Sequence, residues 1–366
     1  MIRVLQSVNI MDRAGLETML MNYYRNIDRN IIQFDFLTHR PQRGAYDEEI
    51  KSMGGKVFYA PRLYPQHLPQ YYKYMKAFYK EHPEYQIIHS HIDSMSYFPL
   101  KAAKKNGIPI RIAHSHSSKL DRDLKLPIKY YALKSIHRVA NRECACGELA
   151  GNFMFPKSSF KIIHNAIDLD KFAYNEIKRT EIRKKLNCEN KFVMGHVGRF
   201  CYVKNQSFLI ELLEEIKKKR TDSMLILVGK GPDEEKLRQQ IKNKGLEDYV
   251  IFLIDRSDVD MLYQAFDVFV MPSQFEGLPV VGVEAQANGL PMIVSDKVSS
   301  EIKLTSSVVQ LSLDTGEKTW TDRILNLGAD RNMNAQAELR AAGYDIKIEA
   351  RKLQEWYIEL SKSIAE

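Results

Sequence analysis

Short runs of β-branched and other apolar residues alternate with helix-like patterns along the whole of this 366-residue chain. Such alternation is typical of the α/β class, in which parallel strands are joined by crossover helices. In the first half it predicts strands at residues 3–9, 33–37, 56–59, 87–90, 110–114, 143–146 and 160–163. In the second half it predicts strands at residues 192–197, 224–228, 250–253, 268–271 and 292–295. Each half is therefore expected to form its own doubly wound sheet.

The length of the chain favours two domains, because a single hydrophobic core rarely grows to this size. The polar stretch 175–190 contains a charge-rich helical pattern but no strand, and we interpret it as a connector. We predict an N-terminal domain at residues 1–170, a linker at 171–190 and a C-terminal domain at 191–344. Residues 345–366 form a last helical segment, whose apolar positions near helical spacing are Ile348, Leu353, Trp356, Tyr357 and Leu360.

The composition favours a cytoplasmic protein with a basic first half. There is no apolar run long enough to span a membrane and no signal-peptide pattern at the N-terminus. The four cysteines fit reduced thiols, and their spacing does not match a zinc site. Residues 1–170 carry 25 Lys and Arg against 16 Asp and Glu, a balance of +9, and the remainder of the chain carries −1, which together give the net charge of +8. The partner of this half is expected to be anionic: a nucleic acid, a membrane surface or a lipid diphosphate.

Two segments of the first half combine basic and aromatic residues. In residues 71–80 the apolar side chains follow helical spacing, and Lys73, Lys76 and Lys80 lie on the opposite arc. Residues 127–138 repeat the pattern. We favour helices that cover the sheet and turn a basic face to solvent, with membrane docking as the alternative.

The segment from Glu276 to Glu284 is the most informative local motif. It places one carboxylate in a loop, Pro279 at the first turn of a helix and a second carboxylate inside that helix. The free N–H groups at Val280 and Val281, with the helix dipole, suit an anion such as a diphosphate. The two glutamates would bracket this anion and accept hydrogen bonds from sugar and ribose hydroxyls.

A second motif follows the first predicted strand of the second half. A glycine at the strand end, Gly198, permits close approach of a ligand, and Arg199 and Lys204 could converge on one diphosphate without a metal ion. A solvated turn with incidental charges is the alternative. The later turn that contains Gly229 and Gly231 matches neither a P-loop nor a dinucleotide fingerprint, so it predicts only a tight turn.

Histidine pairs mark two predicted strand ends in the first half. His89 and His91, like His114 and His116, are two residues apart and should face the same side of the sheet, at the edge where α/β sheets bind ligands. This raises a metal site as one interpretation. We favour hydrogen bonding and predict no metal, because no clear carboxylate partner accompanies them. Near the first strand, Gly15 either lets a ligand approach the backbone or is structural.

Taken in order, these motifs resemble the retaining GT-B glycosyltransferases of family 4. The resemblance covers most of the chain, and the pair Glu276 and Glu284 is its most specific part. It implies two Rossmann-like domains facing across a cleft, with a nucleotide-sugar donor held mainly by the second and an acceptor held by the first. It also implies a C-terminal helix that returns to the N-terminal domain.

The resemblance assigns roles by position. Arg199 and Lys204 would bind the donor diphosphate, Glu284 the ribose and Glu276 the donor sugar. Arg256 lies where the nucleobase is contacted. The active-site histidine falls best on His116, with His114 second. The implied catalytic residues are His116, Glu276, Arg199 and Lys204, and the implied donor-binding residues are Gly15, Arg199, Lys204, Arg256, Glu276, Gly277, Leu278, Pro279, Val280 and Glu284.

Two positions depart from the family pattern. Ile254 or Asp255 replaces a common glycine, and Ala166 follows Asn165 where glycine is usual. Both departures suggest subfamily differences and leave the diphosphate-binding positions intact.

The expected function is therefore that of a hexosyltransferase in exopolysaccharide or capsule biosynthesis, using a nucleotide diphosphate sugar, UDP-linked by preference. The acceptor would be a glycan or a polyprenyl-diphosphate-linked saccharide. The resemblance implies neither cofactor nor metal and no nucleic-acid partner, and the basic half suggests a peripheral association with the inner face of the cell membrane. A nucleotide-sugar epimerase and a non-catalytic nucleotide-sugar sensor are the alternatives. A dinucleotide-dependent oxidoreductase is disfavoured, since no Gly-x-Gly-x-x-Gly follows a strand.

Overall fold

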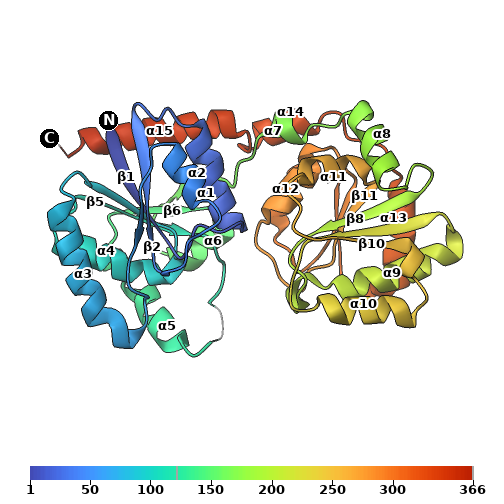
Figure 1. Ribbon diagram of the computed structural model, residues 1–366, viewed down its shortest axis with the longest axis horizontal. Helices are drawn as coiled ribbons and strands as arrows, with labels where there is room; N and C mark the ends of the chain where they lie inside the picture. The colour runs from blue at the N-terminus through green and yellow to red at the C-terminus, as the bar shows by residue number, and fades with distance from the viewer. Residues whose placement is uncertain (121–122, 365–366) are drawn as a thin grey trace. The chain divides into compact units, whose positions relative to one another are not determined.

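The computed structural model describes residues 1–120 and 123–364 and divides into two compact units. Unit 1 contains Met1–Ala166 and the C-terminal segment that begins at Ile346, whereas unit 2 contains Ile167–Asp345 (Figure 1). Each unit is built on one parallel sheet. The α/β class with two doubly wound sheets is thereby confirmed. Within the described residues, no helix is both long and apolar enough to cross a membrane.

The sheet of unit 1 has seven strands in the order β3-β2-β1-β4-β5-β6-β7, and all neighbouring strands run parallel. The strands are β1 (Ile2–Val8), β2 (Ile32–Thr38), β3 (Val57–Tyr59), β4 (Ile87–Ser90), β5 (Ile110–Ser115), β6 (Arg142–Ala145) and β7 (Lys161–Ile162). The order changes direction between β1 and β4. Open sheets of this kind bind ligands at the carboxyl ends of the strands beside such a switch point.

Helices cover both faces of the unit 1 sheet (Figure 1). They are α1 (Gly15–Asn26), α2 (Asp47–Ser52), α3 (Leu68–Glu81), α4 (Tyr97–Lys105), α5 (Leu126–Ser135), α6 (Glu148–Met154) and α15 (Ile346–Lys362). Successive strand residues face opposite cores: Val4 packs with α1 and α15, whereas Leu5 packs with α3, α4 and α5. The apolar side of α3 is buried, which confirms the expected covering helix. Of the apolar residues noted in the C-terminal segment, Ile348 points outward and is 36% exposed.

Unit 2 has a six-stranded parallel sheet in the order β10-β9-β8-β11-β12-β13. Its strands are β8 (Phe192–Val197), β9 (Ser223–Val228), β10 (Val250–Leu253), β11 (Val268–Met271), β12 (Met292–Ser295) and β13 (Val308–Leu311). Its helices are α7 (Leu169–Phe172), α8 (Glu176–Lys185), α9 (Gln206–Lys219), α10 (Glu234–Asn243), α11 (Val259–Ala265), α12 (Val280–Ala287), α13 (Gly316–Leu327) and α14 (Ala335–Ala341). One core holds α8, α11, α12 and α14, and the other holds α9, α10 and α13.

All twelve predicted strands are present, with ends that differ by at most two residues. The sequence analysis missed β13, which pairs only with β12. Its four residues are all half-buried, and serines flank them on both sides. A short edge strand of this kind lacks the strongly apolar run by which the others were recognised.

The segment expected to be a linker, residues 171–190, instead packs within unit 2. Two arginines of α8, Arg179 and Arg183, form ion pairs with Asp267 at the start of β11. The same carboxylate accepts a hydrogen bond of 2.7 Å from the backbone N–H of Val193 in β8. The expectation of a connector was wrong because the charges that suggested a solvated helix include two side chains that point inward.

Candidate active site

Four histidines at the carboxyl ends of β4 and β5 form a hydrogen-bonded cluster in unit 1. His89 Nε2 lies 3.1 Å from His114 Nδ1, and His91 Nδ1 lies 3.1 Å from His116 Nε2. The rings of His114 and His116 stack with centroids 4.0 Å apart, and those of His89 and His91 stack at 4.2 Å. The expectation that each pair faces one side of the sheet is confirmed.

The histidine cluster is anchored by two residues that the sequence analysis did not connect with it. Gln6 of β1 accepts a hydrogen bond from His91 Nε2 through its Oε1 atom, at 2.8 Å. The Gln6 Nε2 atom donates to the Tyr357 hydroxyl of α15, 3.4 Å away. That hydroxyl lies 2.7 Å from His89 Nδ1. Gln6 is fully buried in β1, whose residues from Val4 to Val8 are all buried. A buried amide needs partners, and this was the signal that could have identified it.

Burial holds the cluster in its neutral form. Desolvation, reinforced by the neighbouring histidines, lowers the pKa of His89, His91 and His114 well below the ordinary value. Desolvation also lowers the pKa of His116, to about 3. A neutral imidazole has one donor and one acceptor nitrogen.

The proton positions in the cluster follow from these contacts. Because Gln6 Oε1 accepts from His91 Nε2–H, His91 Nδ1 accepts from His116 Nε2–H, and Nδ1 is the acceptor nitrogen of His116. In the other branch the Tyr357 hydroxyl donates to His89, and His89 donates to His114. His114 Nε2 then carries a hydrogen and is buried, with no hydrogen-bond partner among the residues that the structure describes.

The same histidines bear on the question of a metal ion. Nitrogens of His89, His91 and His114 lie within 4.8 Å of one another, close enough to share one ion. However, both nitrogens of His89 and of His91, and Nδ1 of His114, already make hydrogen bonds. A metal would have to displace these bonds, so metal-free chemistry stays our prediction.

Asp93, after β4, fixes the backbone beside the cluster. Its carboxylate accepts from the N–H of His116 at 2.7 Å and from the N–H and hydroxyl of Ser117 at 3.1 and 3.0 Å. Asp93 itself has a positive φ of 47°. Left-handed backbone at a residue other than glycine is found most often where surrounding contacts enforce it.

In unit 2 the two predicted motifs come together. The Lys204 ammonium forms an ion pair with the Glu276 carboxylate, and both side chains are largely buried. Two hydrogen bonds tie their loops: Gln274 N–H donates to the Val203 carbonyl at 2.8 Å, and Asn205 Nδ2 donates to the Pro272 carbonyl at 3.0 Å. The structure therefore places the cation and the loop carboxylate at one point beside α12.

The glycine turn after β9 supports this loop, a role that the sequence analysis missed. Gly229 has φ of +143°, and a Cβ there would lie 2.1 Å from the Gly198 carbonyl oxygen. A Cβ at Gly231 would lie 2.1 Å from the Phe200 carbonyl oxygen. Both contacts require glycine, because backbone cannot yield to a methyl group. The turn thus holds the strand end that carries Arg199, whose side chain is exposed and makes no hydrogen bond or ion pair with described residues.

The helix α12 begins at Val280, with Pro279 in extended conformation as its N-cap. Gly277 has open space where a Cβ would be, and Leu278 is buried. Inside the helix, Glu284 accepts a hydrogen bond of 2.9 Å from the Tyr263 hydroxyl. Desolvation raises the pKa of Glu284 to about 7, although the bond from Tyr263 opposes this shift.

Two further predicted residues lie apart from these contacts. Arg256 is occupied by a bidentate ion pair with Asp258, at 2.7 and 2.5 Å. A Cβ at Gly15 would meet no atom within 4 Å, so packing does not require glycine at the start of α1. The structure therefore leaves the backbone at Gly15 open to a ligand, and it gives Arg256 a local partner.

Comparison with known proteins defines the class. A family model described as glycosyl transferases group 1 matches residues 178–342, and one described as glycosyltransferase family 4 matches residues 13–171. Together with the two parallel-sheet units, these matches define a glycosyltransferase of the GT-B fold.

The relatives confirm that the chain belongs to the GT-B glycosyltransferases. It is 35% identical to the Bacillus subtilis protein EpsF, named as a glycosyltransferase, over 94% of this chain and 93% of the relative. It is 25% identical to the capsular polysaccharide biosynthesis glycosyltransferase CapH of Staphylococcus aureus, over 98% and 99%. The solved structure of Anabaena HepE with UDP-glucose has the same fold, with a TM-score of 0.80, 19% identity and coverage of 98% and 100%.

Proposed function

We propose that the protein transfers a hexose, with retention at the anomeric carbon, from a UDP-sugar to a hydroxyl of a glycan or polyprenyl-diphosphate-linked acceptor in polysaccharide biosynthesis. The observation that carries this proposal is the Lys204–Glu276 pair beside the start of α12, in a chain of this family. The names of CapH and of the UDP-glucose complex of HepE support the pathway and the donor class.

In the proposed reaction the bond between the anomeric carbon and the diphosphate breaks, the acceptor oxygen bonds to that carbon, and the proton of the acceptor hydroxyl passes to the leaving diphosphate. Negative charge develops on the leaving diphosphate, where Lys204, Arg199 and the first N–H groups of α12 would stabilise it. These groups take the place of a metal ion. Once the Lys204 ammonium contacts the diphosphate instead of Glu276, the Glu276 carboxylate is free to accept hydrogen bonds from hydroxyls of the donor sugar.

The remaining residues have supporting roles in this proposal. Glu284 holds the ribose hydroxyls, and the backbone from Gly277 to Val280 holds the phosphates. Arg256 leaves its ion pair with Asp258 to contact the nucleobase. At Gly15 the absence of a side chain lets the donor phosphate approach the backbone. On the acceptor side, His116 presents the acceptor nitrogen Nδ1 to a sugar or acceptor hydroxyl, and the His114 ring stacks against it.

Transfer is tested by incubating the full chain with UDP-glucose, UDP-galactose or UDP-GlcNAc and a glycan or lipid-linked acceptor. NMR should show one donor sugar moved to the acceptor with the α-anomer retained, and the rate should persist in excess EDTA. Conversion of the donor without an acceptor would identify an epimerase. Donor binding with no turnover would identify a sensor, and an absolute requirement for Mg²⁺ or Mn²⁺ would remove the metal-free mechanism.

Donor binding should strengthen as pH rises through about 7, the pKa to which burial raises the Glu284 carboxyl. Below this pH the group is protonated and loses acceptor capacity for the ribose hydroxyls. We expect the Kd of UDP to fall by up to about tenfold from pH 6 to pH 8. This limit applies if UDP binds only when the carboxyl has lost its single proton, because about one molecule in ten is ionised one pH unit below the pKa. Calorimetry at pH 6, 7 and 8 measures this change.

Two variants make the pH experiment specific. Glu284→Gln should bind UDP with only the pH dependence that arises from the phosphate of UDP itself. Tyr263→Phe removes a hydrogen bond that lowers the carboxyl pKa, so its profile should move to higher pH. Identical profiles for wild type and Glu284→Gln would exclude Glu284 from ribose binding.

A further inference from the structure

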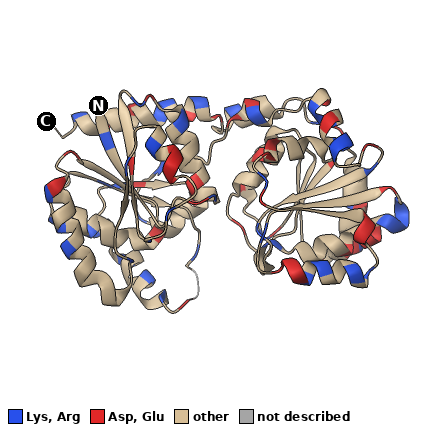
Figure 2. Cartoon of the chain, viewed as in Figure 1, with Lys and Arg blue, Asp and Glu red and all other residues tan. Residues whose placement is uncertain are grey.

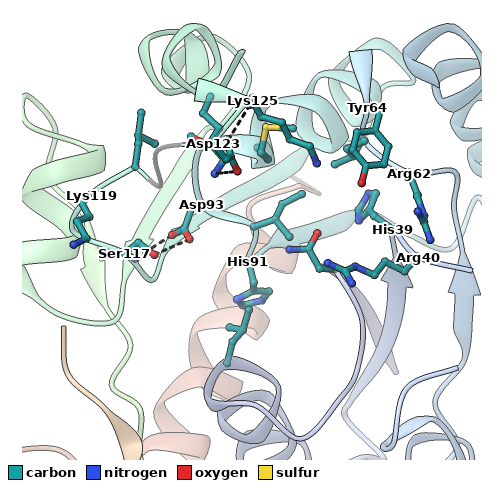
Figure 3. A pocket seen from close by; sticks show the side chains of 18 residues that line it. His39, Arg40, Arg62, Tyr64, His91, Asp93, Ser117, Lys119, Asp123 and Lys125 are labelled. Carbon is teal, nitrogen blue, oxygen red and sulfur yellow. Dashed lines mark hydrogen bonds and ion pairs between the residues drawn. The ribbon is translucent and has the colours of Figure 1, made fainter. Parts of the chain in front are cut away.

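Unit 1 contains a cavity of about 440 Å³ at the carboxyl ends of its strands (Figure 3). Most of its lining comes from residues that follow β1, β2, β3, β4 and β5, which is the edge where open sheets bind ligands. His91 also lines it, so the cavity adjoins the histidine cluster. None of the residues assigned above to the donor lines this cavity.

The cavity is strongly cationic. Among the described residues, the lysines and arginines that line it outnumber the carboxylates Asp93 and Asp123; they are Arg40, Arg62, Lys119, Lys125 and Lys129. Asp123 accepts from Lys129 at 2.9 Å, and Asp93 is committed to the backbone at His116 and Ser117. Lys and Arg are also frequent on the helices around this part of unit 1 (Figure 2). The carboxylates therefore leave an excess of positive charge facing the cavity.

Two arginines supply most of the uncompensated charge. The side chains of Arg40 and Arg62 are exposed and form no ion pair or hydrogen bond with the part of the chain that the structure describes. Elsewhere in unit 1, Arg3 and Arg25 each make a bidentate pair with a carboxylate. A planar guanidinium is well matched to a phosphate, and two of them suit a group with several anionic oxygens.

Exposed apolar residues lie close in sequence to residues that line the cavity. Leu124 is 103% exposed, and Leu126, Tyr130 and Tyr131 are also exposed, at 37%, 52% and 53%. In the sequence they lie next to the cavity residues at positions 123, 125 and 129, just before and within the first half of α5. Contiguous exposed apolar residues mark an interaction surface more often than scattered ones do. A ligand with an anionic head and an apolar chain would contact both features.

We propose that this cavity binds the phosphate or diphosphate group of the acceptor, with Arg40 and Arg62 as its principal ligands. The apolar chain of the same acceptor lies along the surface formed by Leu124, Leu126, Tyr130 and Tyr131. The inference rests on the proposed transferase function and narrows its acceptor to a lipid-linked phosphate. Because His91 lines the cavity, the bound head group would lie next to the histidine cluster that contains His116.

Binding of farnesyl diphosphate, inorganic pyrophosphate and farnesol to the full chain tests the proposal. Calorimetry in saturating UDP keeps the anions from the donor site, and Arg199→Ala should bind them like wild type. We expect farnesyl diphosphate to bind most tightly, pyrophosphate more weakly and farnesol not measurably. Arg40→Ala and Arg62→Ala should each weaken both anions by about ten- to a hundredfold, as for loss of hydrogen bonds to a charged group.

Matched variants separate the two parts of the site. Arg351→Ala, an exposed arginine of α15, should leave both affinities unchanged. Leu124→Ser with Tyr130→Ser should weaken farnesyl diphosphate and spare pyrophosphate. Thermal unfolding confirms that each variant is folded.

The outcomes distinguish this inference from the proposed function. Wild-type affinity in both arginine variants would overturn the anion site, and equal affinity for pyrophosphate and farnesyl diphosphate would overturn the lipid chain. A protein that binds farnesyl diphosphate as expected but transfers no sugar would refute the transferase and keep the cavity assignment. Sugar transfer to a phosphate-free glycan, unaffected by Arg40→Ala, would refute the cavity assignment alone.

Discussion

Replacing Lys204 with alanine should lower turnover by roughly 10² to 10³, the usual cost of removing one preorganised group that stabilises developing charge. The structure holds this ammonium against Glu276, in a largely buried position next to α12. In the proposed reaction, this variant lacks the cation that stabilises the departing diphosphate. It also leaves the Glu276 carboxylate without its counterion. Steady-state kinetics with a saturating UDP-sugar measure the change in kcat.

Three further variants make this result interpretable. Lys204→Arg keeps the charge and should retain more activity than Lys204→Ala. Lys236→Ala removes an exposed lysine of α10 in the same unit and should leave kcat unchanged. Combining Lys204→Ala with Glu276→Gln removes the orphaned charge, so any activity it restores measures the part due to Glu276. A kcat within threefold of wild type for Lys204→Ala would eliminate the cation from the mechanism.

Among the variants proposed here, Asp267→Ala should lower the free energy of unfolding of unit 2 the most. This carboxylate, only 4% exposed, pairs with Arg179 and Arg183 of α8 and accepts from the N–H of Val193. Removing one partner of a buried ion pair costs about 3–5 kcal/mol, because the remaining charges stay buried without compensation. Native-state hydrogen exchange of the β8 amides in urea reports the loss for unit 2 separately from unit 1.

An exposed ion pair of the same unit provides the control. Lys219 and Asp322 pair at the surface, where each side chain is nearly half exposed. Asp322→Ala should therefore change stability by no more than about 1 kcal/mol. If Asp267→Ala behaved like this control, α8 would be a loosely attached helix, as the sequence first suggested.

The fold was predictable because every strand except β13 leaves a local signal. A buried parallel strand is a compact apolar run, and the runs at β8 and β11 could be recognised without knowledge of their neighbours. The position of α8 could not, since solvated and inward-facing arginines have the same sequence pattern. Only the location of Asp267, 88 positions away from Arg179, distinguishes them.

The candidate site was predictable to the same extent: its local motifs could be found, but the distant residues that contact them could not. Glu276, Glu284 and Lys204 stand in local motifs, and the structure brings Lys204 to Glu276. The partners that tune these groups come from distant segments: Tyr263 for Glu284, and Tyr357 for His89. Such pairings depend on tertiary packing, which no single window of sequence contains.

The C-terminal helix α15 has a consequence for how the protein matures. Its side chains complete the core of unit 1, and its Tyr357 hydroxyl anchors the histidine cluster together with Gln6. Synthesis on the ribosome proceeds from the N-terminus, so all of unit 2 emerges before unit 1 receives its last core helix. A nascent or truncated chain that ends before residue 346 has the complete sequence of unit 2 but lacks the anchor of its histidines. The core of unit 1 is therefore completed only after all of unit 2 has been synthesised.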